Sequence, residues 1–277
     1  MGLRISTNMA ALSANRALTK TSDDQAKIYQ RLSSGQRITQ AGDDAAGLSI
    51  SENLRAQVRS MTQAERNAND GISFAQVAEG GLSEIGNIMI RMRELSVQAA
   101  SDTIGDKERG YINQEVQSLM QEVDRIANVT TFNGTPLLNG QSNKDTLEFQ
   151  VGTRNDEADR ILFNAAENDV RASALGIEGL DYSTIDGARE AIDKVDEAVG
   201  RVFNSRARLG AMQNKLHATV NNLGIAKENL SQARSRIADT DVAAETSELV
   251  RGNILQSAGI SVLAQANSAP MGALKLL

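Results

Sequence analysis

The sequence has very little of what compact cores and reactive sites are usually built from. Its 277 residues include no cysteine, no tryptophan, 2 prolines and 1 histidine, and aromatic residues make up 3%. Without cysteine no disulfide forms, and His217 alone cannot supply the Cys and His clusters that bind transition metals. Since compact cores usually take much of their buried area from aromatic rings, the composition favours an elongated helical protein with aliphatic contacts.

Charge and hydropathy exclude two further classes of protein. The 35 Asp and Glu outnumber the 29 Lys and Arg, which gives a net charge of −6, and the two signs are interleaved along the chain. Nucleic-acid binding needs a clustered basic surface, which this distribution lacks. No apolar run approaches the roughly 20 residues of a membrane span, and no cleavable secretory signal is recognisable. We therefore expect no nucleic-acid partner and no membrane insertion.

The most regular pattern in the chain is a heptad repeat between about residues 188 and 237. Large apolar residues recur every seven positions, and mostly small ones follow three positions later. These residues are Val195, Val202, Leu209, Leu216, Leu223, Leu230 and Ile237, with Ala198, Ser205, Met212, Thr219, Ala226 and Ala233. Such spacing is the a/d seam of a coiled coil and predicts one rod, roughly 75 Å long at 1.5 Å per residue.

The rod needs partner helices, and the sequence offers two. Residues 44–99 repeat an apolar residue every seven positions, and residues 106–128 show apolar residues at alternating spacings of four and three. A short turn between them would make an antiparallel hairpin, which with the rod gives a three-helix bundle. Gly71, Gly80 and Gly81 each lower helix propensity by about 1 kcal/mol and are tolerable where neighbours approach closely.

Between about residues 130 and 184 the helical periodicity gives way to turns and strands. Asn133-Gly134 is a typical turn pair, and Leu147 and Phe149 alternate with polar residues as in a strand. The pattern predicts a β-hairpin that caps one end of the bundle. Ser183-x-x-Asp186 has the form of a capping box and is predicted to start the rod.

Both ends of the chain are predicted to be helical. A helix over 1–32 stops at Ser33-Ser34-Gly35, and a helix over 242–268 starts after Asp239-Thr240-Asp241. Both are apolar enough to pair with each other. The expected fold class is therefore mainly α, with a long antiparallel coiled-coil or helical bundle, a small β-hairpin region, and a domain of paired N- and C-terminal helices.

No set of residues indicates catalysis or a cofactor. Asp43-Asp44 could act as paired carboxylates, but no basic or aromatic partner stands nearby, and capping of the following helix is the better interpretation. Gly80-Gly81 lacks the Gly-Lys-Ser/Thr of a phosphate loop. His217 follows a core position of the rod and is expected to be solvated. The sequence therefore predicts a protein that is not an enzyme and uses no cofactor or metal.

Short motifs spread over nearly the whole chain, specific only in combination, resemble those of bacterial flagellins. They are Ile5-Ser-Thr-Asn8 with Leu12, Arg31-Leu-Ser-Ser-Gly35, Arg37-Ile38, Asp43-Asp-Ala-Ala-Gly47-Leu-Ser-Ile50, Arg91-Met-Arg-Glu-Leu95-Ser-Val-Gln98, Thr131-Phe-Asn-Gly134, Val151-Gly152, Asn253-Ile-Leu255, Leu263-Ala-Gln-Ala-Asn267 and Leu276-Leu277. The resemblance implies a filament subunit whose paired terminal helices form an inner tube and whose bundle forms an outer tube. The stretch between the third helix and the rod is too short for the hairpin plus another domain, which implies a minimal form.

Applied to this chain, the resemblance implies three domains. Residues 1–43 are the N-terminal helix and connector of the inner tube, 44–237 the bundle with its hairpin at about 130–184, and 238–277 the C-terminal helix of the inner tube. Packing inside the inner tube is expected from the apolar residues of the two ends. These are Ile5, Met9, Leu12, Ile254, Leu255 and Leu263.

The resemblance also implies function and partners. Copies are expected to polymerise into the extracellular flagellar filament used for swimming, after export of the unfolded chain by the flagellar export apparatus with an export chaperone and a filament cap. Some flagellins are recognised by an animal Toll-like receptor, and the matching residues here are Arg91, Leu95 and Glu115. Arg91 and Glu115 could equally form a plain salt bridge, and Ile90 stands where recognised forms commonly carry glutamine.

Two other classes of protein remain open from the sequence. A hook–filament junction protein of the same export system would share the terminal helices but depart in the middle, where Thr131-Phe-Asn-Gly134 instead agrees with flagellin. An unrelated coiled-coil scaffold or chaperone would need no apolar terminal pairing and would be a soluble oligomer.

Overall fold

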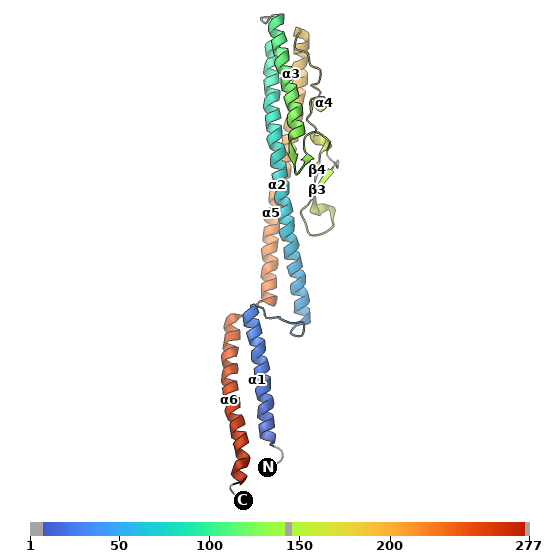
Figure 1. Cartoon of the computed structure of the whole chain (residues 1–277). Coiled ribbons are helices and arrows are strands. Elements are labelled where there is room, and N and C mark those ends of the chain that lie inside the picture. The colour runs from blue at the N-terminus through green and yellow to red at the C-terminus, as the bar shows by residue number, and fades with distance from the viewer. Residues whose placement is uncertain (1–7, 142–145, 275–277) are drawn as a thin grey trace. The chain divides into compact units, whose positions relative to one another are not determined.

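The computed structural model describes residues 8–141 and 146–274, and helices account for most of them (Figure 1). The predicted mainly α fold with a small β region is confirmed. The helices are α1 (Met9–Ser34), α2 (Ala45–Ala99), α3 (Asp106–Val129), α4 (Ala172–Leu175), α5 (Ile185–Ala238) and α6 (Val242–Leu274), and the strands are β1 (Thr131–Phe132), β2 (Thr135–Pro136), β3 (Thr146–Gln150) and β4 (Arg160–Asn164).

The chain divides into two compact units. The terminal unit takes in residues 1–58 and 228–277, and the bundle unit takes in residues 59–227. The division falls inside α2 and α5, so each of these long helices contributes one end to the terminal unit.

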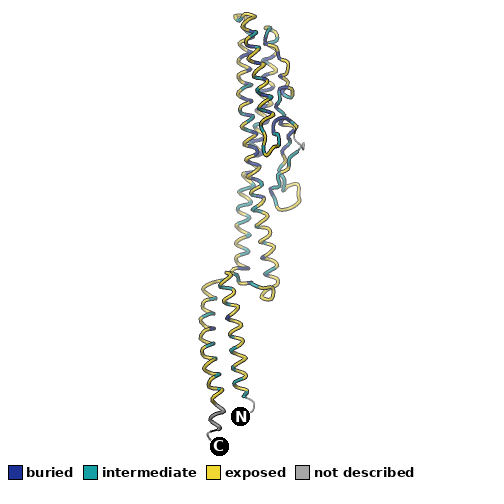
Figure 2. Tube along the Cα trace, viewed as in Figure 1, coloured by how far each residue is buried: buried dark blue, intermediate teal, exposed yellow. Residues whose placement is uncertain are grey.

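In the bundle unit, α2, α3 and α5 bury the stripes that the heptads predict. Val195, Val202 and Leu216 of the α5 seam are fully buried, whereas Leu223 is half-buried. Figure 2 shows buried residues in dark blue along the helices of the bundle. Leu223 lines a hollow together with Met61 of α2 and with Val151 and Ile161 of the β region, so it is only partly covered.

The small strands form two separate antiparallel pairs. β1 and β2 are joined by Asn133-Gly134, both with positive φ (49° and 76°), which is the geometry that a two-residue hairpin turn requires. β3 pairs with β4 so that Phe149 lies opposite Ile161.

These strands lie along the side of the bundle, so the predicted cap at one end of it is wrong. The Phe74 ring of α2 makes edge-to-face contacts with the rings of Phe132, Phe149 and Phe163, with centroids 5.7, 5.2 and 4.8 Å away. The aromatic cluster fixes the β region beside the middle of α2, where it continues the layer that α3 begins. The sequence pattern did not reveal this position because it depends on contacts between residues distant in the chain.

Two glycines of α2 allow this close approach. A Cβ atom at Gly71 would lie 3.2 Å from Leu216 Cδ1 and 3.3 Å from Phe149 Cδ1. A Cβ atom at Gly81 would lie 2.8 Å from both Leu138 Cδ1 and Thr130 Oγ1, closer than such atoms can pack. The low helix propensity of these glycines is therefore offset by the close packing of neighbouring side chains against α2.

We expect Gly81→Ala to lower the unfolding free energy of the bundle by about 1–3 kcal/mol, the usual range for overpacking. The neighbouring Gly80 is the matched control, since nothing lies within 4 Å of its Cβ position. Gly80→Ala should instead raise stability by about 1 kcal/mol through better helix propensity. Urea unfolding followed by circular dichroism measures both, and equal shifts in the two variants would contradict the packing explanation.

Polar side chains mark the helix starts. The Asp44 carboxylate accepts a hydrogen bond from the Gly47 amide at 2.8 Å, which confirms the predicted cap of α2. Asp43 accepts instead from the Thr39 hydroxyl and from the Thr39 and Gln40 amides, and these bonds lower the pKa of its carboxyl. At α5 the prediction is wrong by one residue, because Thr184 caps the Gly187 amide in place of Ser183.

In the terminal unit, α1 and α6 run side by side in opposite directions (Figure 1). The segments next to them form an antiparallel bridge between Gln36 and Asp239. Around it, the Thr240 amide donates to the Gly35 carbonyl at 3.0 Å and the Arg37 amide donates to the Ala238 carbonyl at 2.7 Å. The chain can turn here because Gly35 adopts a positive φ of 67° at the end of α1.

Candidate assembly surface

The two terminal helices pair through a seam that is mostly small and polar. Along both helices the half-buried or buried positions recur at alternating spacings of three and four residues, as in a coiled coil. The seam includes Ala11, Ala14, Leu18, Thr21, Gln25, Ile28 and Leu32 of α1, and Glu245, Leu249, Gly252, Gln256, Gly259, Leu263 and Ala266 of α6. Five of these side chains are leucine or isoleucine, and the other nine are alanine, glycine or polar.

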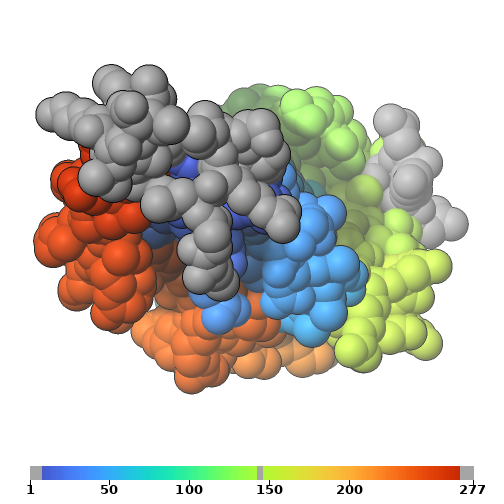
Figure 3. All heavy atoms as spheres, turned by 90° about the horizontal axis from the view of Figure 1, so that it is seen from below, coloured from blue at the N-terminus to red at the C-terminus, as the bar shows by residue number. Residues whose placement is uncertain are grey.

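Large apolar side chains lie outside the seam and are exposed on both helices. This outward apolar surface consists of Met9, Leu12 and Tyr29 of α1, and Val242, Val250, Ile254, Leu255, Ile260 and Val262 of α6. Met9 and Ile254, for example, are 63% and 64% exposed. Figure 3 shows part of the α6 surface in red. Because isolated soluble chains rarely expose apolar side chains in such numbers, the surface is suited to being covered by another protein surface.

The structure assigns different positions to the residues predicted to pack inside an inner tube. Four of them belong to the outward apolar surface: Met9, Leu12, Ile254 and Leu255. Leu263 is half-buried in the seam between α1 and α6. Ile5 lies outside the described residues. The sequence did not distinguish seam residues from outward residues, because α6 is apolar on several faces at once.

On the bundle, the predicted pair of Arg91 and Glu115 does face across α2 and α3. Arg91 donates from Nε and Nη2 to Glu115 Oε1 at 3.1 and 3.0 Å, and from Nη1 to Glu94 Oε2 at 3.1 Å. All three side chains are about half exposed. The bonds to Glu115 and then to Glu94 raise the pKa of Arg91, so its charge is fixed at every accessible pH.

Leu95 does not share this exposure, which corrects its predicted role as a contact residue. Its side chain is 1% exposed and belongs to the bundle core, whereas Ile90 on the same helix is exposed. A partner on the outside of the bundle cannot touch Leu95.

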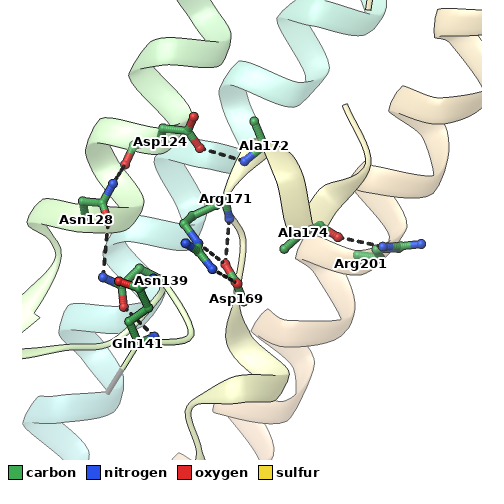
Figure 4. A network of polar contacts seen from close by, with 9 residues as sticks. All are labelled: Asp124, Asn128, Asn139, Gln141, Asp169, Arg171, Ala172, Ala174 and Arg201. Carbon is green, nitrogen blue, oxygen red and sulfur yellow. Dashed lines mark hydrogen bonds and ion pairs between the residues drawn. The ribbon is translucent and has the colours of Figure 1, made fainter. Parts of the chain in front are cut away.

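A network of polar contacts holds the segment after β4 against the bundle (Figure 4). The Asp124 carboxylate of α3 accepts from the Ala172 amide at 2.8 Å, and Arg201 of α5 donates to the Ala174 carbonyl at 2.8 Å. Asp169 accepts two further bonds from the Arg171 side chain, which raise the pKa of Arg171. Sequence reasoning missed this network, since its members are single polar residues without periodic spacing.

The described part of the chain contains neither a cluster of metal ligands nor a membrane-spanning helix. Within residues 8–141 and 146–274, no three His, Cys, Asp or Glu side chains are grouped so that they could hold a metal ion. The helices in those ranges include none that is long and apolar enough to cross a membrane.

Comparison with known sequences gives full-length matches. The model of the bacterial flagellin N-terminal helical region matches residues 5–143, and that of the flagellin C-terminal helical region matches residues 192–277. A flagellin of Halalkalibacterium halodurans is 43% identical over 273 residues, which cover 99% of each chain. The flagellar filament core protein flaB2 of Brachyspira hyodysenteriae is 41% identical over 286 residues, also 99% of each chain.

Solved structures agree with these matches. The crystal structure of Bacillus cereus flagellin has a TM-score of 0.51 and 28% identity, and the alignment covers 57% of this chain and 88% of that one. A hook-associated protein of Vibrio parahaemolyticus has a TM-score of 0.60 but only 14% identity over 71% of this chain and 100% of that one, so it shows the fold alone. None of these findings favours the junction protein or the scaffold. The chain belongs to the bacterial flagellin family, whose members are structural subunits of the extracellular flagellar filament and not enzymes.

Proposed function

We propose that the outward apolar surface of α1 and α6 is the contact through which copies of this chain assemble into the filament. The single observation that carries the proposal is the exposure of large apolar residues on both terminal helices, all of them outside the seam that the two helices share. Fully burying one such side chain contributes about 1.5–3 kcal/mol. Contacts of this kind that do not close on themselves build a helical tube.

In this proposal the inner tube consists of residues 1–43 and 238–277 and the outer tube of residues 44–237. The bridge between Gln36 and Asp239 and the turn at Asp43 would then form the connector between them. Supporting this assignment, the exposed apolar residues of α6 start immediately after the bridge, at Val242.

Seeded growth tests the proposal directly. Purified chain is heated to monomer, cooled with short filament seeds and examined by electron microscopy. Long tubes growing from the seeds are expected for the full chain, and none for a chain lacking residues 1–20. Growth that survives this deletion, or a discrete soluble oligomer from the full chain, would overturn the proposed role of the terminal helices.

The terminal helices are further proposed to become ordered only on assembly. Nearly all positions of the seam are only half-buried, whereas ordering two long helices costs conformational entropy of about 1–2 kcal/mol per residue for the backbone alone. An unfolded terminal unit would suit passage through the export apparatus with a chaperone, and folding beneath a filament cap.

Hydrogen exchange distinguishes the two states. We expect the backbone amides of α1 and α6 to exchange within seconds in the free chain and to become protected by at least about a hundredfold in the polymer. The amides of α2 and α3 in the bundle are the internal control, since their protection should be similar in both states. Strong protection of α1 in the free chain would contradict folding on assembly.

For recognition by an animal Toll-like receptor, Arg91 and Glu115 are proposed as the contact residues and Leu95 as their support. Arg91→Ala should reduce receptor activation while lowering bundle stability by at most about 1 kcal/mol, because exposed ion pairs contribute little. Arg125→Ala is the matched control, since Arg125 forms an exposed ion pair with Glu122 on α3. A receptor-reporter assay with equal activation by both variants would contradict the assignment.

A further inference from the structure

One polar side chain lies at the centre of the seam between α1 and α6. Gln25 occupies the heptad position shared with Ala11, Leu18 and Leu32, and it is 6% exposed. Within the described length of α1 it is the one residue that is fully buried. A polar group at such a position lowers stability unless its hydrogen bonds are made. The residue of α6 that bonds to Gln25 can therefore determine how the two helices align.

Gln25 fits a specific place on α6. Its Nε2 donates a hydrogen bond to Asn253 Oδ1 at 3.1 Å. A Cβ atom on Gly252 would lie 3.0 Å from Gln25 Cγ and 3.1 Å from its Nε2, so the side chain lies in a notch that glycine leaves. Both the notch at Gly252 and the hydrogen bond to Asn253 therefore favour this position of Gln25 on α6.

Shape alone would not define how the helices align. Gly259 lies one heptad after Gly252, in the same seam, so sliding α6 by seven residues would bring another glycine opposite Gln25. In that register, however, Ile260 would replace Asn253 and offer no acceptor. A slide in the other direction would place Glu245 opposite Gln25 and leave no notch. The polar partner thus distinguishes registers that the small residues of the seam do not.

We propose that Gln25 and Asn253, with Gly252 between them, specify the register in which α1 and α6 pair. Two other cross-helix side-chain contacts agree with the register. The Arg31–Glu245 pair at 3.2 Å, with side chains 29% and 13% exposed, supports the same register from one end of the seam, whereas Asn253 is exposed and Gln25 is the buried member of its pair. Asn8 donates to the backbone carbonyl of Ala266 at 2.8 Å, and a carbonyl is present at every register.

The competing determinant is the bridge between Gln36 and Asp239, which a seven-residue slide of about 10 Å would break. The register matters because it fixes where the outward apolar residues of α1 stand relative to those of α6. This inference concerns pairing within one chain and goes beyond the proposed function, so it can be tested on chains that never assemble.

Engineered disulfides can read the register, because the full chain has no cysteine of its own. A Cβ atom at Gly259 would lie 3.4 Å from Leu18 Cδ1, so Leu18→Cys with Gly259→Cys reports the observed register. Leu18→Cys with Ala266→Cys reports the register shifted by one heptad. Each double-cysteine variant is equilibrated in a thiol–disulfide buffer, at a protein concentration that keeps the full chain monomeric. Mass spectrometry measures the fraction of chains that have formed the disulfide. This fraction gives the effective concentration of one thiol near the other. The ratio of the two values measures the register even when the helices pair only transiently.

Gln25→Met, which keeps the size but removes the donor, should lower the ratio of observed to shifted register by about fivefold, the value of one hydrogen bond. Thr21→Val is the matched control, since the Thr21 hydroxyl bonds only to the Ala17 carbonyl of its own helix, and it should leave the ratio unchanged. Exchanging the two α6 residues (Asn253→Ile with Ile260→Asn) should favour the shifted register. Equal ratios in Gln25→Met and Thr21→Val, or no response to the exchange, would overturn the proposal and assign the register to the bridge.

Discussion

Ile254→Asp is expected to abolish seeded filament growth while leaving the bundle folded. Ile254 is among the most exposed apolar residues of α6 and lies outside the seam with α1, so its replacement removes no contact within the chain. In the filament the variant loses about 1.5–3 kcal/mol of apolar burial and places an unpaired carboxylate in an apolar contact, which costs more. The critical concentration for growth should therefore rise by at least about a hundredfold.

Sedimentation of seeded reactions measures the critical concentration, and circular dichroism of the free chain checks that the bundle has formed. Ser257→Asp is the matched control, because it adds the same charge one turn further along α6 at an exposed position that carries no apolar side chain. Loss of growth in Ile254→Asp with retention in Ser257→Asp supports the outward apolar surface. An equal loss in both would show that charge on α6, and not the apolar residue, is what assembly resists.

The helices were predictable because each depends on information within its own segment. The heptad of residues 188–237 corresponds to α5 at Ile185–Ala238, and the stretch 106–128 corresponds to α3 at Asp106–Val129. Capping is equally local, and Asp44 does cap α2. The error at α5, where Thr184 takes the place of Ser183, is one residue along the chain. It arises because neighbouring hydroxyl residues are equally good caps by composition.

The orientation of the terminal helices was not predictable in the same way. Apolar periodicity assigns a face only when one face is clearly more apolar than the rest, and α6 carries large apolar residues such as Val250, Ile254 and Ile260 around much of its circumference. The structure pairs α1 and α6 through a seam of small, polar and aliphatic residues, and leaves those large residues outward. Only the observed burial distinguishes the residues that pack within the chain from those that stay exposed.

The position of the β region depends on a contact that no local pattern contains. Phe74 lies in α2 but outside the seven-residue apolar series of that helix, and its partners come from β1, β3 and β4, more than fifty residues further along the chain. Such a contact predicts that one substitution in α2 will release the whole β region.

Phe74→Ala is accordingly expected to lower the unfolding free energy of the bundle by about 3–5 kcal/mol, the range for losing a buried phenylalanine. Phe74 is 3% exposed and is the ring that Phe132, Phe149 and Phe163 all contact, so the loss includes the edge-to-face interactions as well as the buried area. Urea unfolding gives the free energy. Limited proteolysis should cut the variant within residues 146–164 under conditions that leave the parent chain intact.

Phe203→Ala provides the control for this second prediction, since it removes the same side chain from a long bundle helix at a position that is 44% exposed. Its cost should stay below about 1 kcal/mol, because little apolar area is lost at a surface position. If both variants lose the same stability, or if the strands of Phe74→Ala remain resistant to protease, the aromatic cluster is not what holds them. The remaining contacts at Gly71 and Gly81, together with the Asp124–Ala172 bond, would then be sufficient to fix the β region on the bundle.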